Sequence, residues 1–575
     1  MNLGQTLIPK INSLSKSHLA HPTVQGIHPQ TLGRILPMNF QCSTMNPEER
    51  IKNLMTKMET WLFIIISLCV AAFLKSLYDF FFPKLNLPPG PTRVPLIGNF
   101  LLFRKSLVDF EPVIRNLHSK YGPILTVHFG SRPVIFVSSD SLSHQALVQK
   151  GAVFADRTEA LPISKIFSSN KHTISTAFYG PTWRVLRRNL TTEILHPSWV
   201  RSYAHARKWV LGILLSRVTG HSGPVRVVDH FRYAMFYLLV LMCFGDKLKE
   251  NQIREIETIQ RRLLLRFRRV NILSFWPRLR MLLFRKHWEE ALQLRKDQEG
   301  IILPHTRARQ QLKQQLRSKE QEDDSDPGSS SSSTEYVLSY VDTLLDLQLP
   351  EEENRKLSEG EMVSLCSEFL NGGTETTSTT LQWIMANLVK HPHIQAKLFE
   401  EISGVVGEGG EEVKREDLQK MPYLKAVILE GLRRHPPAHF LLPHSVTQDT
   451  TLEGFAIPKN TLVNFMVADM GWNPKIWDDP MAFKPERFMN SKGNGVEAFD
   501  VTGRKEIRMI PFGAGRRICP GYELAILHLE YFVANLVLNF EWRAVDGDEV
   551  DLSEEQGFTV EMKNPLQVHL SPRRK

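Results

Sequence analysis

The stretch that decides the fold is Pro511-Phe512-Gly513-Ala514-Gly515-Arg516-Arg517-Ile518-Cys519-Pro520-Gly521, which an apolar helical run follows from Tyr522. Its glycines and prolines predict a tight turn around Cys519, with bare amide N–H groups that can point at the sulfur. The charges of Arg516 and Arg517 and the positive end of the following helix all favour a thiolate. Such a cysteine suits a metal ligand or a reactive nucleophile; the alternative is an inert buried cysteine in a glycine-rich turn.

The spacing Phe512-x-x-Gly515-x-Arg517-x-Cys519-x-Gly521 resembles the heme-binding loop of the cytochrome P-450 superfamily, with every signature position filled. The resemblance implies a mainly α-helical cytochrome P-450 fold with small β-sheets, and heme b (iron protoporphyrin IX) as the cofactor. It implies that Cys519 is the axial ligand of the iron, a thiolate that favours O–O cleavage. It also implies that Arg517 pairs with a heme propionate and that Phe512 packs beside the thiolate.

A second motif predicts a helix that faces the cofactor. Ser358-Glu359-Gly360-Glu361 is a capping box that opens a long helix. Two adjacent glycines, Gly372 and Gly373, cost this helix roughly 1 kcal/mol each relative to alanine, so something should compensate. Close approach of a flat cofactor would do so, whereas the alternative is a kinked core helix with a polar patch. The segment resembles the superfamily's oxygen-activation helix, which implies that Thr376 hydrogen-bonds dioxygen and that Glu375 supplies protons.

A charged pair matches a structural motif of the superfamily. Glu430-x-x-Arg433 places opposite charges one turn apart on a helix, which alone would be an ordinary surface pair. With Arg487, in Pro485-Glu486-Arg487-Phe488, the resemblance implies a buried cluster that locks the heme-binding core. Removing one member would leave a buried charge unpaired, which is costly. The expected role is structural, not catalytic.

Three more residues are expected to hold the cofactor. Trp183-x-x-x-Arg187 puts an indole N–H and a guanidinium one turn apart, and both suit a carboxylate. The family uses this pair on the heme propionates; the alternative is an exposed helix pair. His444 lies where the family carries an arginine or a histidine for a propionate.

Composition narrows the classes of partner. The 575 residues carry a formal net charge of +10, which nucleic acid, an anionic membrane surface or an acidic protein partner could each explain. We expect no nucleic acid, because no zinc-finger spacing or RNA-binding aromatic motif is present. The cysteines are scattered without a Cys-x-x-Cys, which argues against a zinc site or a disulfide framework and favours a reducing compartment. They are Cys42, Cys69, Cys243, Cys366 and Cys519.

The amino-terminal region predicts a membrane anchor. The apolar stretch 61–82 reaches the length of about 20 residues that a bilayer-spanning helix needs. We therefore expect an extension at 1–57, a transmembrane anchor at 58–83, a proline-rich hinge at 84–98 and a catalytic domain at 99–575. The extension lacks acidic residues before Glu48, as a transit peptide does, or it is an over-extended start before Met58. An over-extended start predicts the endoplasmic reticulum membrane with a cytosolic catalytic domain, whereas a transit peptide predicts a plastid.

Four other segments have a predicted character. The hinge is expected to be a stiff strut or else a turn-rich linker, and residues 122–139 read as a β-hairpin. Residues 325–334 are a serine-rich flexible insert. The stretch 261–288 combines arginines with apolar residues, which suits either a lipid headgroup interface or a solvated helix pair.

The resemblance covers the chain from Leu87 onward and is closest to the plant microsomal A-type group, with a looser likeness to plant family 89. It implies insertion of one oxygen atom from O2 into a lipophilic substrate, either a plant secondary metabolite or a tetrapyrrole catabolite. Because no Rossmann fingerprint or phosphate-binding loop is present, we expect electrons from a separate NADPH–cytochrome P-450 reductase. The rivals are a heme-thiolate isomerase or dehydratase and a non-catalytic heme-binding protein; Glu375 and Thr376 argue against both. By analogy, four segments line the substrate site: 156–179, 369–375, 437–442 and 556–560.

Overall fold

The computed structural model describes residues 47–81, 85–94, 98–99, 102, 110–130, 132–220, 223–245, 248–267, 285–323, 337–407, 409–491, 495, 499–545 and 549–573. The chain divides into two units, Met1–Ala72 and Phe73–Lys575. Three sequence predictions fall outside the described residues: most of the extension at 1–57, the middle of the basic stretch at 268–284, and the serine-rich insert at 325–334.

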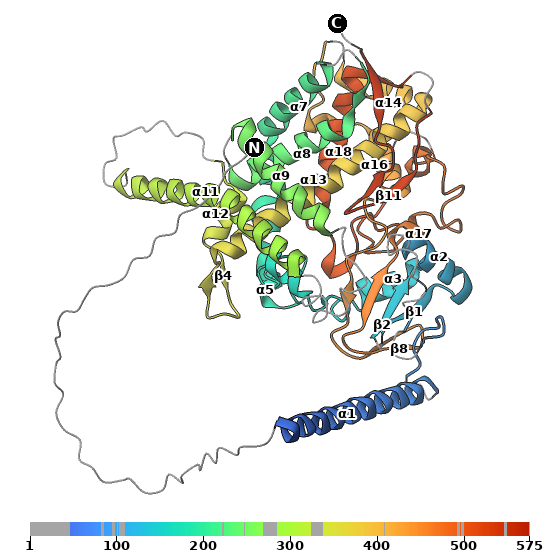
Figure 1. Cartoon of the computed structure of the whole chain (residues 1–575). Helices are drawn as coiled ribbons and strands as arrows, with labels where there is room; N and C mark the ends of the chain where they lie inside the picture. Colours follow the sequence, from blue (N-terminus) through green and yellow to red (C-terminus); the bar gives the residue numbers. More distant parts are fainter. Residues whose placement is uncertain are drawn as a thin grey trace, which may run out of the picture. The chain divides into compact units, whose positions relative to one another are not determined.

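The core of the second unit is a group of long helices around α13 (Glu359–Lys390), which packs against α8 (Val227–Phe244), α16 (Pro422–Arg434) and α18 (Tyr522–Asn539) (Figure 1). The predicted capping box starts α13: the Ser358 N–H donates to Glu361 Oε2 at 2.7 Å, and the Glu361 N–H donates to Ser358 Oγ. Helix α8 is long and apolar enough to cross a membrane, but 89% of it is buried in this core.

The main sheet contains the predicted hairpin. Strands β1 (Ile124–Phe129) and β2 (Arg132–Val137) pair antiparallel, β2 pairs parallel with β9 (Leu462–Phe465), and β6 (His444–Ser445) closes the sheet beside β9. The other sheets are small: β10 (Phe540–Ala544), β13 (Gln567–Pro572) and β3 (Val225–Arg226); β11 (Glu554–Gln556) and β12 (Val560–Met562); β4 (Gln348–Leu349) and β5 (Arg355–Lys356); β7 (Thr450–Leu452) and β8 (Phe455–Ile457).

The prediction of a mainly helical fold with small sheets is confirmed. Other described helices are α2 (Phe110–Tyr121), α3 (Asp140–His144), α4 (Pro162–Phe167), α5 (Pro181–Asn189), α6 (Pro197–Ser202), α7 (Ala204–Thr219), α9 (Glu250–Phe267), α11 (Arg285–Asp323), α12 (Tyr340–Leu345), α14 (Pro392–Val406), α15 (Arg415–Leu418) and α17 (Val467–Gly471). Short π-helical turns are η2 (Gln145–Gln149) and η3 (Leu190–Ile194); 3-10 turns are η5 (Pro485–Phe488) and η6 (Gly515–Arg517).

The predicted anchor is part of a single helix, α1 (Pro47–Phe81). Its window Met58–Lys75 has the length and composition of a membrane span, and none of the window is buried in the protein. The helix begins before Met58, so residues 58–81, the described part of the segment expected at 58–83, are the carboxyl-terminal part of a longer helix.

The hinge is bound to the sheet over the part that the structure describes. The Thr126 N–H on β1 donates to Pro89 O at 2.8 Å, and a Cβ on Gly90 would lie 2.0 Å from Thr126 O. Asn99 continues the contact, because its Oδ1 accepts from the His128 N–H at 2.7 Å. Residues 85–94 are therefore docked on the catalytic domain; residues 95–97 of the predicted strut lie outside the described part.

Part of the described basic stretch contacts a neighbouring helix. Arg262 and Arg266 on α9 form ion pairs with Asp297 and Glu290 of α11, both at 3.3 Å. Leu263 and its neighbour Leu264 are buried. In this part of the stretch, helix pairing accounts for these four residues, whereas Arg261 is exposed and Leu265 is 53% exposed, so both alternatives stay predictions.

Candidate active site

The loop around Cys519 is a turn that needs glycine at two positions. Gly513 and Gly515 have φ of +73° and +69°, values that other residues rarely adopt. A Cβ on Gly515 would also lie 1.8 Å from the carbonyl oxygen of Leu147. The Cys519 N–H donates to Phe512 O at 2.8 Å and closes the turn just before α18 begins. The predicted turn is therefore formed, and local sterics explain its glycines.

The electrostatics of the sulfur differ from the sequence prediction. The Gly521 N–H and the Arg187 guanidinium both favour the thiolate, but burial outweighs them and raises the pKa of the Cys519 thiol. Arg516 is exposed, and Arg517 is directed at backbone carbonyls. The predicted lowering of the thiol pKa by these two arginines was therefore wrong, because the charge that faces the sulfur comes from α5. Binding of a metal ion would itself drive off the thiol proton.

Arg517 is a half-buried cation without a carboxylate partner in the described part of the chain. It donates to Ala155 O at 2.7 Å, to Ile174 O at 3.1 Å and to Ala177 O at 2.7 Å. Burial, together with the charge of Arg157, lowers its pKa to about 9. A guanidinium whose described contacts are all neutral carbonyls would gain from an anionic ligand.

Arg157 is a second cation in the same surroundings. Its guanidinium donates to Ser175 O, Leu442 O and Pro443 O, each at 2.9 Å, and burial lowers its pKa to about 10. Arg157 thus links Ser175 to the two residues just before β6, and Arg517 links the segment 155–177 to the Cys519 loop. The carboxylates of Asp156 and Glu368 favour the charge of Arg157 from nearby, but the guanidinium itself donates only to carbonyls, so it keeps the capacity to bind a further anion.

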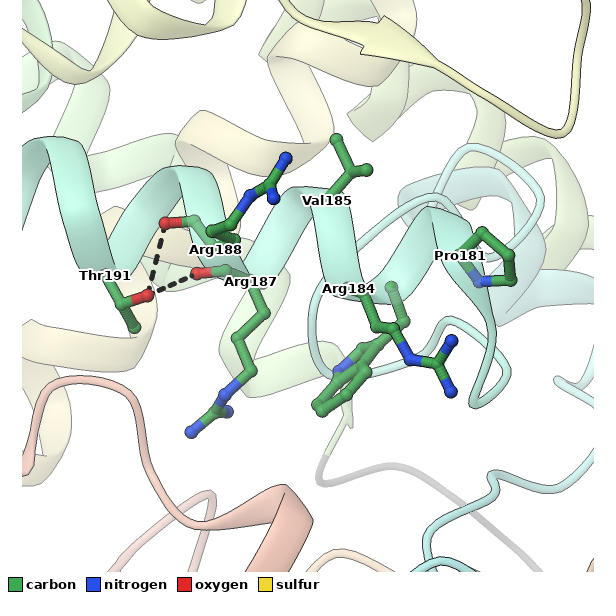
Figure 2. A pocket seen from close by; sticks show the side chains of 7 residues that line it. Pro181, Arg184, Val185, Arg187, Arg188 and Thr191 are labelled. Atoms are coloured by element: carbon green, nitrogen blue, oxygen red, sulfur yellow. Dashed lines mark hydrogen bonds between the residues drawn. The ribbon is translucent and has the colours of Figure 1, made fainter.

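Helix α5 places the predicted tryptophan and arginine on its inner side. Trp183 is 5% exposed, and its Nε1–H has no hydrogen-bond partner among the described residues. The Arg517 guanidinium lies 4.5 Å from the centre of its ring, and Arg187 donates to Ile518 O at 2.6 Å. A cavity of about 570 Å³ opens beside these side chains, and Figure 2 shows Arg187 and Arg184 pointing to the same side of the helix.

These residues fit a heme. The orphaned indole N–H and the guanidiniums of Arg157, Arg187 and Arg517 are donors for the carboxylates of an anionic cofactor. The half-buried thiol of Cys519 is a soft ligand suited to iron. We conclude that the donor set and the sulfur suit the same group.

Phe512 and His444 are the remaining two predicted cofactor residues. Phe512 is half-buried, with its ring 6.2 Å from that of Tyr522. His444 is buried on β6, with Nδ1 2.6 Å from Phe154 O, and burial lowers its pKa to about 3. His444 is therefore a neutral imidazole whose only N–H, at Nδ1, donates to Phe154 O. Its Nε2 carries no proton and could not donate to a propionate, so the structure does not support the expected propionate contact.

The two glycines of α13 have different surroundings. Gly372 is exposed, and a Cβ there would meet no atom within 4 Å. A Cβ on Gly373 would lie 2.8 Å from Leu239 of α8. The prediction that both glycines admit a flat cofactor is therefore corrected: Gly372 borders open space, whereas Gly373 allows close helix packing. Thr376 lies one turn after Gly372 and donates its hydroxyl to Gly372 O at 2.7 Å.

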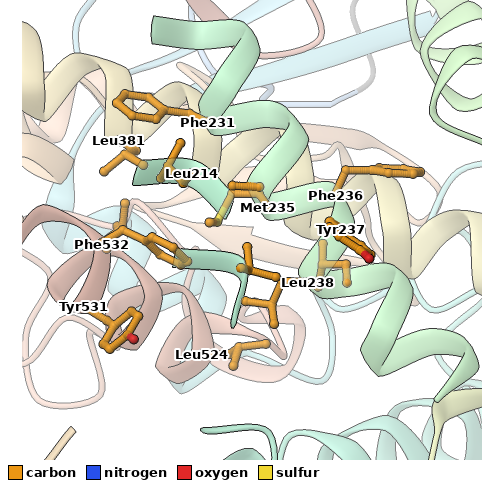
Figure 3. Packing of buried hydrophobic residues seen from close by; sticks show 14 of the residues in the cluster. Leu214, Phe231, Met235, Phe236, Tyr237, Leu238, Leu381, Leu524, Tyr531 and Phe532 are labelled. Carbon is orange, nitrogen blue, oxygen red and sulfur yellow. The ribbon is translucent and has the colours of Figure 1, made fainter. Parts of the chain in front are cut away.

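Glu375 is held in a buried ion pair. Its carboxylate lies 3.0 Å from Nε of Arg232, a buried residue of α8, and Arg232 also contacts Asp229 at 3.3 Å. Around the pair, α8 packs its apolar side chains against α13 and α18; Figure 3 shows Phe231 near Leu381. Glu375 lies on the helix that the sequence predicted. Its partner Arg232 lies on α8, so the sequence of α13 alone could not identify it.

The three members of the predicted structural cluster come together. Arg433 donates to Glu430 through Nε at 2.7 Å and Nη2 at 2.8 Å, and Arg487 donates to the same carboxylate at 3.1 Å. Arg433 also reaches the carbonyls of Gly471 and Pro480, each at 2.7 Å. The side chains of Glu430 and Arg433 are fully buried, so this cluster fixes α16 to the chain before η5.

Three of the four predicted substrate segments leave apolar side chains open, and 369–375 does not. Phe440 packs on Phe110 at 5.8 Å, and Leu370 is fully buried in the helical core. Open apolar side chains are Phe178, Ala438, Leu442 and Phe558. The tip of the β11–β12 hairpin reaches α13, because Thr559 Oγ1 lies 3.0 Å from Thr379 Oγ1.

Sequence reasoning missed three charged residues of this region. Arg157 and Arg232 are described above; the third is Glu368, a buried α13 carboxylate that accepts from the Ser175 N–H at 2.7 Å and the Ile174 N–H at 2.8 Å. Burial raises the pKa of Glu368. Arg157 and Arg232 also have partners 18 and 3 positions away, but the contacts that place the three residues in this region, to Leu442 and Pro443, to Glu375 and to Ser175 and Ile174, span 143 to 286 positions, so no local pattern could reveal them.

Comparison with known proteins identifies the family. The family model "Cytochrome P450" matches residues 88–570. The chain is 52% identical to cytochrome P450 89A9 of Arabidopsis thaliana over 90% of this chain and 99% of that protein. It is 31% identical to cytochrome P450 750A1 of Pinus taeda (84% and 90% covered) and 29% identical to phenylacetaldehyde oxime monooxygenase CYP71AN24 of Prunus mume (85% and 90% covered). The resemblance read from the Cys519 motif is confirmed, as is the heme cofactor that it implied. The chain belongs to the cytochrome P450 family of heme-containing monooxygenases, and its relatives are cytochromes P450 of plants.

Proposed function

We propose that this chain is a membrane-anchored monooxygenase in which Cys519 is the axial ligand of the heme iron. The observation that carries the proposal is the half-buried sulfur of Cys519, which the Gly521 N–H and the Arg187 guanidinium face. When bound, heme supplies the activation of O2 for insertion of one oxygen atom into an organic substrate. The side chains of the chain itself would hold the cofactor, position the substrate and handle protons.

We assign the propionate contacts to α5 and to the Cys519 loop. The Trp183 Nε1–H and the guanidiniums of Arg187 and Arg517 have the hydrogen-bond capacity for carboxylates. Phe512 is proposed to pack beside the sulfur, whereas His444, whose only N–H donates to Phe154 O, has no second N–H for a propionate. Trp183, Arg187 and Arg517 would hold the cofactor through its carboxylates.

Thr376 and Glu375 are proposed to handle protons. The Thr376 hydroxyl donates to Gly372 O and keeps its oxygen toward the open space that borders Gly372. Arg232 holds Glu375 as a carboxylate, and a guanidinium does not itself give up protons. Proton supply through Glu375 therefore requires that this ion pair opens, so Arg232 would slow proton delivery.

The substrate is proposed to be lipophilic, because Phe178, Leu442 and Phe558 leave apolar surface open in three of the predicted lining segments. A tetrapyrrole catabolite is the narrower proposal. The Lys171 ammonium lies 2.9 Å from the centre of the Phe178 ring, in the segment 156–179, where it would suit a carboxylate-bearing substrate. The broader alternative remains another plant secondary metabolite.

Electrons are proposed to come from NADPH through a separate reductase on the same membrane. Arg184 and Arg188 of α5 and Arg516 of the Cys519 loop are exposed, and together they suit an acidic partner. Helix α1 would hold the chain in the endoplasmic reticulum membrane, with the plastid as the alternative if the extension acts as a transit peptide. The Arg188→Glu variant should slow reduction most at low salt and leave the carbon monoxide spectrum unchanged.

The test of the proposal combines spectroscopy and turnover. Reduced protein with carbon monoxide should give the Soret band typical of thiolate ligation, and Cys519→Ser should lose it. Microsomes that contain the chain and a reductase should transfer isotope-labelled oxygen from O2 to a compound of a plant extract. Turnover of a hydroperoxide without NADPH would instead favour an isomerase or dehydratase, and absence of any NADPH consumption would favour a heme-binding protein without catalysis.

A further inference from the structure

A turn shortly before α5 has a strained backbone and is bound to one face of α13. Ser169, Asn170 and Lys171 have φ of +43°, +56° and +75°, which are left-handed values that residues other than glycine rarely adopt. Ser169 Oγ donates to Gly360 O at 2.8 Å and also lies 2.8 Å from Ser364 Oγ. Because this backbone conformation is unfavourable by itself, contacts with the rest of the protein must compensate for it.

Glu368 binds the next residues of the same turn. Its Oε2 accepts from the Ile174 N–H at 2.8 Å, and its Oε1 accepts from the Ser175 N–H at 2.7 Å. The hydroxyls of Thr173 and Ser175 add hydrogen bonds, and all of these contacts oppose the burial that raises the pKa of Glu368. Both oxygens of the carboxyl group are therefore engaged by consecutive residues of the turn.

The residues that Glu368 binds also hold two guanidiniums. Ile174 O accepts from Arg517 at 3.1 Å, and Ser175 O accepts from Arg157 at 2.9 Å. Each of these two residues thus gives its N–H to Glu368 and offers its carbonyl to an arginine. A movement of the turn away from α13 would take these acceptors away from both guanidiniums.

The contacts of the turn follow one face of α13. Residues of this helix that are four positions apart lie above one another on the same face. The turn contacts the first three members of such a row, and the fourth borders the open space described above. The row consists of Gly360, Ser364, Glu368, Gly372 and Thr376.

We propose that Glu368 is a positioning residue that fixes the turn 169–177 to α13 and thereby sets where the guanidiniums of Arg157 and Arg517 lie. The inference rests on the proposed function, in which such guanidiniums bind the carboxylates of the cofactor. Loss of the Glu368 contacts lets the strained backbone relax, so both guanidiniums lose part of their support and the cofactor is held less tightly. Glu368 needs no contact with the cofactor in this role.

Glu401 on α14 offers a matched control. Its carboxylate accepts from the Tyr423 N–H at 2.7 Å and from the Leu424 N–H at 2.8 Å, and burial raises its pKa as well. It therefore makes the same contact with two consecutive N–H groups, but at the start of α16. A change from Glu to Gln at either position keeps the size of the side chain and removes one of the two acceptor oxygens.

The experiment measures heme transfer from the full chain to apomyoglobin, together with thermal unfolding of the same samples. Glu368→Gln and Glu401→Gln should both lower Tm, because each loses a hydrogen bond of the same kind. Only Glu368→Gln should transfer heme faster, by about tenfold, the effect of losing one hydrogen bond to a charged group. Glu368→Gln that folds but contains no heme would support the inference too.

A second variant tests whether Glu368 acts through Arg517. Arg517→Lys keeps the charge but cannot reach the three carbonyls that the guanidinium binds. In this background, Glu368→Gln should speed heme transfer by no more than about threefold, because the group that Glu368 positions is already gone.

Equal heme-transfer rates in Glu368→Gln and Glu401→Gln would overturn the inference and leave the proposed function intact, as would the full tenfold effect in the Arg517→Lys background. Unchanged heme transfer with slower NADPH-supported turnover would also overturn it, since Glu368 would then act on the reaction itself. If Glu368→Gln does not fold, Glu368→Asp, which keeps both oxygens on a shorter side chain, takes its place in the comparison. A parent without the thiolate carbon monoxide spectrum would instead overturn the proposed function.

Discussion

Two glycines of the same loop should differ strongly in how much stability they lose on substitution by alanine. Gly515 has φ of +69°, and its added Cβ would lie 1.8 Å from Leu147 O, whereas a Cβ on Gly521 would meet no atom within 4 Å. The left-handed backbone costs alanine about 1–2 kcal/mol. Overpacking against a backbone carbonyl adds about 1–3 kcal/mol, because the loop must move by more than an ångström to clear it. Gly515→Ala should therefore lose roughly 2–5 kcal/mol, concentrated at the loop that presents Cys519.

Gly521→Ala keeps the N–H that points at the sulfur and changes only the residue before α18. Alanine is a poorer N-cap than glycine, so we expect a cost of about 1 kcal/mol or less. The assay is the carbon monoxide difference spectrum per mole of purified protein, with thermal unfolding of the same samples. Gly515→Ala should have little thiolate-ligated heme and a lower Tm, and Gly521→Ala should resemble the parent. Equal loss in both variants would refute the steric argument, since both positions belong to the same signature.

Three further predictions follow from single contacts. Trp183→Phe retains an aromatic ring beside Arg517 but removes the unpartnered Nε1–H, so heme transfer to apomyoglobin should become about tenfold faster; an unchanged rate would show that this N–H does not hold the cofactor. Glu375→Gln should leave the carbon monoxide spectrum intact and slow NADPH-supported turnover about 10²-fold, and full turnover would exclude Glu375 from proton supply. Burial raises the pKa of Glu530 to about 7, above its unfolded value of about 4.3, so the folded state keeps a proton that the unfolded state loses. Stability should fall by about 3 kcal/mol as pH rises through this window, and Glu530→Gln should be more stable than the parent above about pH 7, as urea unfolding at several pH values would show.

The structural features that the sequence predicted correctly depend on contacts within short segments of the chain. The turn at Cys519 follows from glycine conformations and one hydrogen bond within the loop, so eleven consecutive residues were enough to predict it. The start of α13 follows from the capping box at Ser358, which involves two residues three positions apart. The hairpin of β1 and β2 follows in the same way from alternation and a short turn.

Partners from distant segments were beyond the sequence. Glu375 was assigned to α13, but its partner Arg232 is 143 positions earlier on a helix whose apolar composition resembles a membrane span. The thiol of Cys519 was expected to respond to the arginines beside it, whereas the facing charge belongs to Arg187 on α5. Neighbours in sequence need not be neighbours of the functional atom, because a tight turn directs successive side chains in different directions.

The charges around the sulfur explain why the motif nonetheless indicated the right chemistry. Burying a guanidinium is costly unless an anion or several acceptors compensate. The described hydrogen bonds of the Arg157 and Arg517 guanidiniums go only to carbonyls, and Asp156 acts on both through its charge alone. A protein that folds around such cations gains stability when a dianionic cofactor binds between them. Cofactor binding and folding of the 155–177 segment should therefore be coupled: removing heme should loosen the backbone whose carbonyls Arg517 holds. Amide hydrogen exchange at Ile174 and Ala177 measures this directly, and equal protection with and without heme would show that the cations are satisfied by the protein alone.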